Sequence, residues 1–202
     1  MKDTVMIKDT SIKSKCAVLA ALWLVPLAAF AHTGAGATTG FAAGFVHPFS
    51  GVDHLLAMLA VGLWAAQLGG RALWAVPATF VTVMLLGAGL AILSAPVPLV
   101  EAGILTSVLV LGALVATAFP LPLAAGALLV GVFALFHGHA HGSEMPLSAA
   151  GLVYSAGFAI ATALLHLVGM AAGIAVQRLN RQTLARFAGG AIAAGGLYLA
   201  IA

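Results

Sequence analysis

Long apolar runs separated by short polar breaks are the dominant pattern of this sequence. We predict helices at about 50–68, 72–93, 100–118, 121–137, 148–177 and 183–202. Each run approaches the roughly 20 residues that a helix needs to cross a bilayer. The breaks contain the residues that end helices, and they read "QLGGR", "SAPVP", "FPLP", "HGHAHGSEMP" and "QRLNRQ". The pattern predicts an all-α fold, a polytopic bundle of six transmembrane helices, with the third and fourth paired tightly across "FPLP".

Residues 1–31 have the pattern of a secretory signal peptide. Four lysines precede residue 16, an apolar stretch follows, and "AFA" at 29–31 matches a small-x-small cleavage site. We expect cleavage after Ala31, which leaves residues 32–202 as the six-helix domain and His32 as its first residue. The amine and imidazole of His32 could then bind a metal ion together. An uncleaved first span is the alternative, and the long basic segment favours it.

The composition excludes a soluble domain and a nucleic-acid-binding protein. The chain has 63% hydrophobic and 6% charged residues, whereas soluble domains carry about 25% charged residues. Its net charge is +3, but the basic residues form no stripe that could follow a phosphate backbone. Cys16 is the only cysteine, so an intramolecular disulfide is excluded. We therefore expect a lipid bilayer and no nucleic acid as partner, and the oligomeric state stays open.

The arginines predict the orientation of the chain in the membrane. Those that follow the predicted signal peptide are Arg71, Arg178, Arg181 and Arg186. In a chain of six spans they fall in or beside loops on one side, and the positive-inside rule makes that side cytoplasmic. The mature N-terminus and the C-terminus are then expected outside. Trp64 and Trp74 flank the first arginine loop, and we expect them to be anchors at the membrane interface.

The segment "HPFSGVDH" at 47–54 places metal-type ligands at the start of the first predicted span. Ser50 and Asp53 resemble a capping box. If the helix continues, His47 and His54 share one face; a break at Pro48 would instead fold His47 back over the mouth of the helix. Either geometry can bring His47, Asp53 and His54 towards one ion. The alternative is a capping carboxylate beside two interfacial histidines.

The segment "FHGHAHGSE" at 136–144 forms a second such cluster. As a helix it places His137, His141 and Glu144 on one stripe and His139 away from it; as an extended chain it aligns the three histidines. We favour the helix, because irregular backbone at membrane depth is costly unless it lines a cavity. A histidine-rich outer loop without metal is the alternative.

Both clusters lie at outer ends of the predicted helices, on the same side of the membrane. Imidazole and carboxylate without thiolate suit Ni(II), Co(II) or Zn(II). Imidazole must be neutral to coordinate a metal, so uptake of such an ion should fail at low pH. His166 lies deep in the fifth predicted span, where it is either a relay ligand or a hydrogen-bonded core histidine.

The two segments carry a resemblance to a known family. "HPFSGVDH" is similar to the HPxxGxDH signature of the HupE/UreJ family of nickel and cobalt permeases, and "FHGHAHGSE" resembles its FHGxAHGxE signature. Every fixed position of both is present, and the likeness covers nearly the whole chain. The resemblance implies that the metal-binding residues are His47, Asp53, His54, His137, His141 and Glu144. His139 occupies a variable position, and with His32 and His166 it is a secondary candidate.

The resemblance implies a secondary permease that takes up Ni(II) or Co(II) across the bacterial cytoplasmic membrane for metalloenzyme maturation. It implies no prosthetic group and no enzymatic activity, with the transported ion as the metal partner. Two other classes stay open: an intramembrane zinc-dependent hydrolase and a metal-delivery accessory protein that does not transport. A hydrolase needs an activated water and a general base beside a fixed metal, and the sequence does not separate ligand from base.

Overall fold

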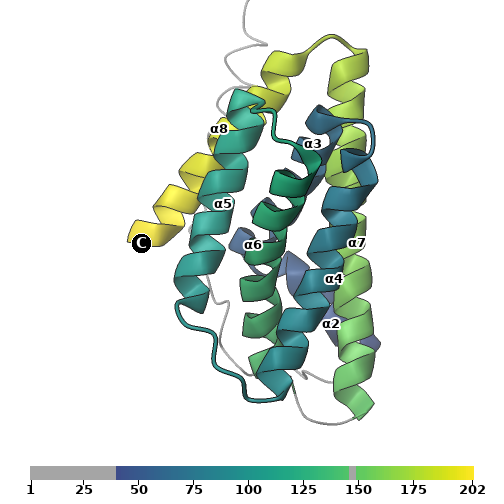
Figure 1. The fold of residues 1–202 in the computed structure, drawn as a ribbon, viewed down its shortest axis with the longest axis vertical. Coiled ribbons are helices and arrows are strands. Elements are labelled where there is room, and N and C mark those ends of the chain that lie inside the picture. Colours follow the sequence, from purple (N-terminus) through teal and green to yellow (C-terminus); the bar gives the residue numbers. More distant parts are fainter. Residues whose placement is uncertain (1–39, 146–148) are drawn as a thin grey trace, which may run out of the picture. The chain divides into compact units, whose positions relative to one another are not determined.

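The structure, a computed structural model, describes residues 40–145 and 149–202, which fold into helices joined by short connections (Figure 1). The elements are α2 (Phe41–Val46), the 3-10 turn η1 (His47–Phe49), α3 (Val52–Leu68), α4 (Ala72–Ile92), α5 (Val100–Thr117), α6 (Leu123–Ser143), α7 (Ala149–Arg178) and α8 (Gln182–Ile201). These residues contain no strand, which confirms the all-α prediction. The predicted signal peptide, its cleavage site and His32 lie outside the described residues.

The described part of the chain contains five helices long and apolar enough to cross a membrane, α4 to α8. A sixth span results if α2, η1 and α3 count as one, because they pass the same test together but are bent by 82°. Pro48 lies in the first turn of η1, where its missing N–H is tolerated. Gly51, the residue that precedes α3, has an extended backbone conformation and caps the helix. The prediction of six spans therefore holds only if the first span is counted as a broken one.

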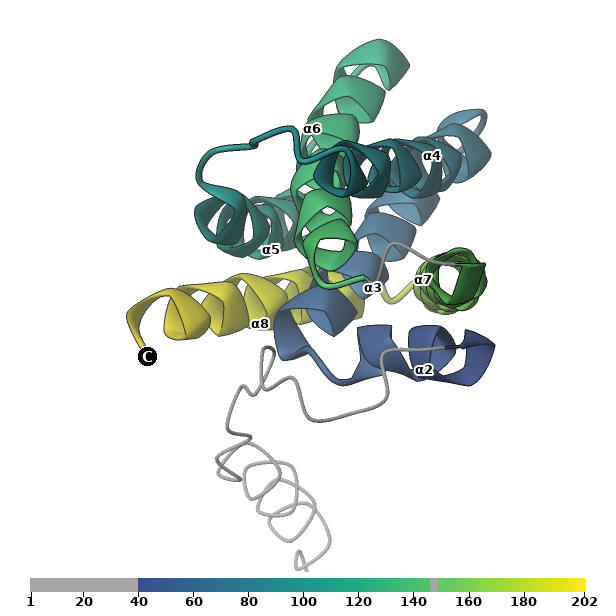
Figure 2. The same ribbon diagram turned by 90° about the horizontal axis from the view of Figure 1, so that it is seen from below.

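Helix α3 lies in the middle of the bundle and contacts α4, α5, α7 and α8 (Figure 2). Its side chains from Ala57 to Ala66 are almost all buried. Trp64 is fully buried and its indole N–H donates to the carbonyl of Phe119 at 3.3 Å, so the prediction of an interfacial anchor was wrong for this residue. It holds α3 to the α5–α6 connection instead. Trp74 is 63% exposed, as an anchor at the interface should be.

Helix α6 packs most extensively on α4, and α5 packs most extensively on α8. The tight pair expected across "FPLP" therefore does not form, although α5 and α6 remain in contact. A Cβ on Gly138 would overlap the carbonyl of Met84, and one on Gly142 would overlap that of Ala88. Small residues of this kind let membrane helices approach closely. Helix α6 also continues to Ser143, so the break expected after residue 137 was wrong, and the histidine-rich segment is helical.

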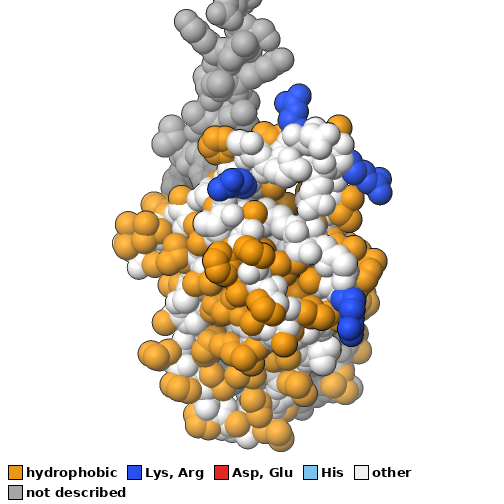
Figure 3. Space-filling view, turned by 45° about the horizontal axis from the view of Figure 1, so that its top comes forward, with side chains coloured by type: hydrophobic (Ala, Val, Ile, Leu, Met, Phe, Trp, Pro, Cys, Tyr) orange, Lys and Arg blue, Asp and Glu red, His pale blue; other side chains and the backbone are white. Residues whose placement is uncertain are grey.

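The two ends of the bundle differ in chemistry. The arginines lie in or beside the α3–α4 and α7–α8 connections. Figure 3 turns that end forward and shows basic side chains around it and a mainly hydrophobic face below it. The α4–α5 connection and the end of α6 lie towards the opposite end (Figure 1), and the start of α3 meets the end of α6 through the rings of His54 and His141. This opposite end holds the candidate metal ligands.

Candidate metal centre

The break at Pro48 decides how the first motif is arranged. The hydroxyl of Ser50 donates to the carbonyl of His47 at 2.5 Å, and Gly51, not Ser50, is the residue that caps α3. The predicted capping box is therefore wrong, because Ser50 belongs to the 3-10 turn that precedes the helix. His47 folds back over the mouth of α3, as in the second of the two predicted geometries.

Asp53 orients the imidazole of His54. One carboxylate oxygen of Asp53 accepts the backbone N–H of His54 at 2.8 Å and lies 2.9 Å from its Nδ1. A carboxylate only accepts hydrogen bonds, so Nδ1 of His54 carries the proton and donates it. The lone pair is then on Nε2, as in metal sites where a carboxylate fixes the tautomer of a ligating histidine.

Helix α6 brings two histidines to this imidazole. Nε2 of His141 lies 2.6 Å from Nε2 of His54, a residue 87 positions away. The ring of His137, one turn earlier, lies 4.8 Å from that of His54 between centroids. Two nitrogens at this distance share a proton, and a first-row ion held by both at about 2.0–2.1 Å would need them slightly farther apart. The helical interpretation of the second motif is thus confirmed, and the two motifs meet.

Glu144 and His47 extend the group towards the surface. Nε2 of His47 lies 3.9 Å from the carboxylate of Glu144. Each of His47, His141 and Glu144 offers a ligand atom within 4.8 Å of the others. Nitrogen and oxygen ligands at about 2.0–2.2 Å from an ion can be up to about 4.4 Å apart, so a small closure would complete a site. The six residues form one group, called the histidine cluster below: His47, Asp53, His54, His137, His141 and Glu144.

His139 points away from the histidine cluster, as the helical stripe predicted. Its Nε2 donates to the carbonyl of Ala95 in the α4–α5 connection at 2.9 Å. This histidine therefore fastens a loop to α6. His166, the other described secondary candidate, is buried in α7 and its ring packs at 5.1 Å against that of Phe80.

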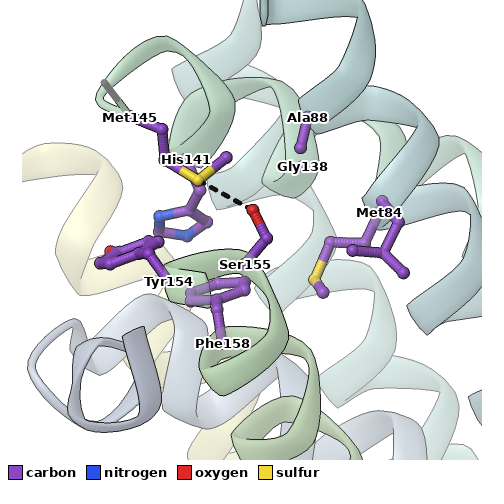
Figure 4. Close-up of a pocket in the computed structure, with 9 residues that line it drawn as sticks. Met84, Ala88, Gly138, His141, Met145, Tyr154, Ser155 and Phe158 are labelled. Atoms are coloured by element: carbon purple, nitrogen blue, oxygen red, sulfur yellow. Dashed lines mark hydrogen bonds between the residues drawn. The ribbon is translucent and has the colours of Figure 1, made fainter. Parts of the chain in front are cut away.

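Helix α7 supplies a wall that the sequence analysis did not identify. The rings of Tyr154 and Phe158 lie 5.8 Å from the ring of His47, and Phe158 lies 4.2 Å from that of His141. Together with Met84 and Met145 they line a cavity of about 10 Å³ beside His141 (Figure 4). That volume suits about one water molecule. The signal that could have revealed this wall is the spacing of four residues between Tyr154, Phe158 and later polar residues of α7.

Comparisons with known proteins agree with the two motifs. The family model described as HupE / UreJ protein matches residues 20–199. Protein HupE of Rhizobium leguminosarum bv. viciae is 46% identical over 190 residues, which cover 93% of this chain and 98% of that relative. No solved structure matches the chain. With the match across nearly its full length and both signatures in contact, this membrane protein belongs to the HupE/UreJ family.

Proposed function

We propose that the protein is a secondary permease that takes up Ni(II) or Co(II) across the bacterial cytoplasmic membrane and so supplies metalloenzymes. The observation that carries this proposal is the meeting of the two motifs, with Nε2 of His54 and Nε2 of His141 only 2.6 Å apart. Imidazole and carboxylate ligands without thiolate suit these ions, although affinity alone does not separate them from Zn(II).

The arrangement of charges supports entry of a dication from the end opposite the arginines. Glu144 is the more exposed of the two acids of the histidine cluster, whereas His54, His137 and His141 are buried. A dication would meet the carboxylate first and then imidazoles in an apolar surrounding. A transporter must bind well enough to replace hydration and weakly enough to release, and ligands from separate helices can separate again.

The sidedness belongs to the same proposal. The arginine end is cytoplasmic by the positive-inside rule, the histidine cluster faces the periplasm, and residues 1–31 are a cleaved signal peptide. Reporters fused after Gly70 and after Asn180 should then be cytoplasmic, and one at the C-terminus periplasmic. A cytoplasmic C-terminal reporter would contradict this topology.

Uptake of radioactive nickel and cobalt into proteoliposomes tests the function directly. Purified wild-type protein should load vesicles with one or both ions, and Asp53→Ala at equal protein content should not. Binding without accumulation would favour a metal-delivery accessory protein. Zinc-dependent hydrolysis of a peptide or ester, abolished by the same substitution, would favour the intramembrane hydrolase.

A further inference from the structure

His166 is a buried polar side chain whose imidazole makes no hydrogen bond within the described part of the chain. It is 1% exposed, and neither ring nitrogen has a hydrogen-bond partner among the described residues. A neutral imidazole carries one N–H donor and one lone pair, both of which normally find partners when buried. A buried donor and acceptor that both lack partners require an explanation. Transient binding of a metal ion to the lone pair of the imidazole is such an explanation.

The position of His166 connects it to the histidine cluster. Tyr154, Phe158, Thr162 and His166 follow each other at intervals of four residues, so they share one face of α7. The first two contact His47 and His141. His166 lies about 12 Å farther along the helix than Phe158. The same face therefore leads from the histidine cluster into the bundle, towards the arginine end.

His137 is the neighbouring imidazole along this direction. Its ring lies 5.5 Å from that of Phe80, and the ring of Phe80 also lies 5.1 Å from that of His166. His137 lies one helical turn, about 6 Å, deeper than His141 along α6. The rings of His137 and His166 thus both contact the ring of Phe80, which connects the two imidazoles along this direction.

The hydrogen bonds of His137 leave a lone pair available on this route. Ser107 donates its only hydroxyl proton to the carbonyl of Ile104 at 2.6 Å. Its oxygen, 2.9 Å from Nε2 of His137, must therefore accept, so Nε2 carries the proton of the imidazole. Nδ1 then holds the lone pair, and this atom is buried without a hydrogen-bond partner among the described residues.

The backbone around His166 is held in place. A Cβ on Gly62 of α3 would overlap the carbonyl of His166, and one on Gly169 would overlap that of Leu59. The two helices touch at this level, so α7 cannot shift towards α3. Thr162, fully buried one turn before His166, adds a hydroxyl that lies 3.9 Å from the sulfur of Met84. Imidazole, hydroxyl and thioether groups therefore lie at this level, and residues 40–145 and 149–202 place no acidic residue on α7 beside them.

We propose that His166, with Nδ1 of His137, forms an inner binding position for the transported dication, beyond the histidine cluster on the way to the arginine end. The proposal rests on the proposed function, since it assumes that Ni(II) or Co(II) passes through the bundle. Because the described residues named for the inner position include no carboxylate, it holds a dication more weakly than the histidine cluster, which favours onward release.

Co(II) bound to full-length His166→Cys tests the ligand directly. A thiolate at this position should add a sulfur-to-Co(II) charge-transfer band in the near ultraviolet, which wild-type protein lacks. Leu165→Cys is the matched control, because Leu165 is also buried at nearly the same depth but points to another face of α7. A band in the first variant alone supports the inner position. No band in a folded His166→Cys protein, or equal bands in both, overturns it.

Uptake by His166→Leu provides a second test that does not depend on the cysteine. Loss of two unsatisfied polar atoms should leave folding intact. We expect Co(II) binding at the histidine cluster to persist and uptake to fall at least about tenfold, as for loss of groups that support metal sites. Wild-type uptake by this variant overturns the proposal. If wild-type protein itself takes up neither ion, the proposed permease function fails, while the thiolate band still reports whether the inner position binds metal.

Discussion

Helices α6 and α8 both pack through glycines against the backbone of a neighbouring helix, but only α6 carries candidate metal ligands beside these glycines. Gly138 and Gly142 of α6 lie against the backbone of α4, and Gly189 and Gly196 of α8 lie against the backbone of α5. Each helix is thus fixed to one neighbour at close range. Helix α6 carries His137 and His141 beside its glycines, whereas α8 contains no histidine, aspartate or glutamate.

The difference shows what close glycine packing contributes to a site. The glycines fix the rotation and depth of a helix relative to its neighbour. The residues beside the glycines decide whether this fixed position also places a ligand side chain in a site. In α6 the histidines next to Gly138 and Gly142 turn towards α3 and α7, where His54 and Phe158 lie. In α8 the close approach of the glycines to α5 contributes to helix packing alone.

The largest effect is expected for the carboxylates of the histidine cluster. Asp53→Ala and Glu144→Gln should each nearly abolish nickel or cobalt uptake, because the first removes the carboxylate that orients His54 and the second removes the carboxylate beside His47. The double variant should be little worse than either single one, as for residues that act as a unit. Tyr198→Phe, near the end of α8, is the control and should transport normally. Single variants that each keep half the activity, with effects that multiply cleanly, would indicate two independent sites.

The next effect separates two histidines of α6 itself. Groups that only support a metal ligand are worth about 10- to 100-fold in metal affinity, so His141→Ala should lower uptake at least about tenfold. His139→Ala should lose only the hydrogen bond to Ala95, worth about 1 kcal/mol of stability. Uptake at matched expression measures both. Equal damage from the two substitutions would contradict the helical stripe as the basis of the site.

A third prediction compares glycines along α6. Gly138→Ala must push α6 away from the carbonyl of Met84. Uptake should fall at least about tenfold, since displacements of about 1 Å in functional sites can cost about 100-fold. Gly131→Ala is the control, because its added methyl would meet side chains only at ordinary contact distances of 3.6 and 3.7 Å. Normal uptake by Gly138→Ala would show that the site tolerates movement of α6.

The smallest effect concerns α8, where stability should change without loss of transport. Gly189→Ala should destabilise the protein by about 1–3 kcal/mol through overpacking against α5. Gly190→Ala, whose added methyl meets nothing within 4 Å, should stabilise it by about 0.4–1 kcal/mol. Thermal unfolding in detergent measures both, with uptake per folded molecule unchanged. A specific transport defect in folded Gly189→Ala would give α8 a functional role that its sequence does not indicate.

Some expectations from the sequence failed because local patterns do not specify long-range partners. Ser50 and Asp53 have the spacing of a capping box, but Pro48 forces a 3-10 turn and Gly51 begins the helix instead. The tight pair across "FPLP" does not form, because the closest approach is between α6 and α4, where glycines meet carbonyl groups. Trp64 has the residue type and the position beside an arginine loop that are typical of an interfacial anchor, yet it lies on the central helix and is fully buried.

The sequence by itself determined the class of the protein and the residues of its candidate site. Apolar length and composition require membrane-spanning helices, and helical periodicity separates His139 from His137 and His141. The tertiary structure decided what no spacing could: that His54 meets His141 across 87 residues, that Ser107 sets the tautomer of His137, and that His166 packs against Phe80 of α4. Periodicity is a property of one helix, whereas these contacts depend on which helix faces which, and that is settled by packing of the whole bundle.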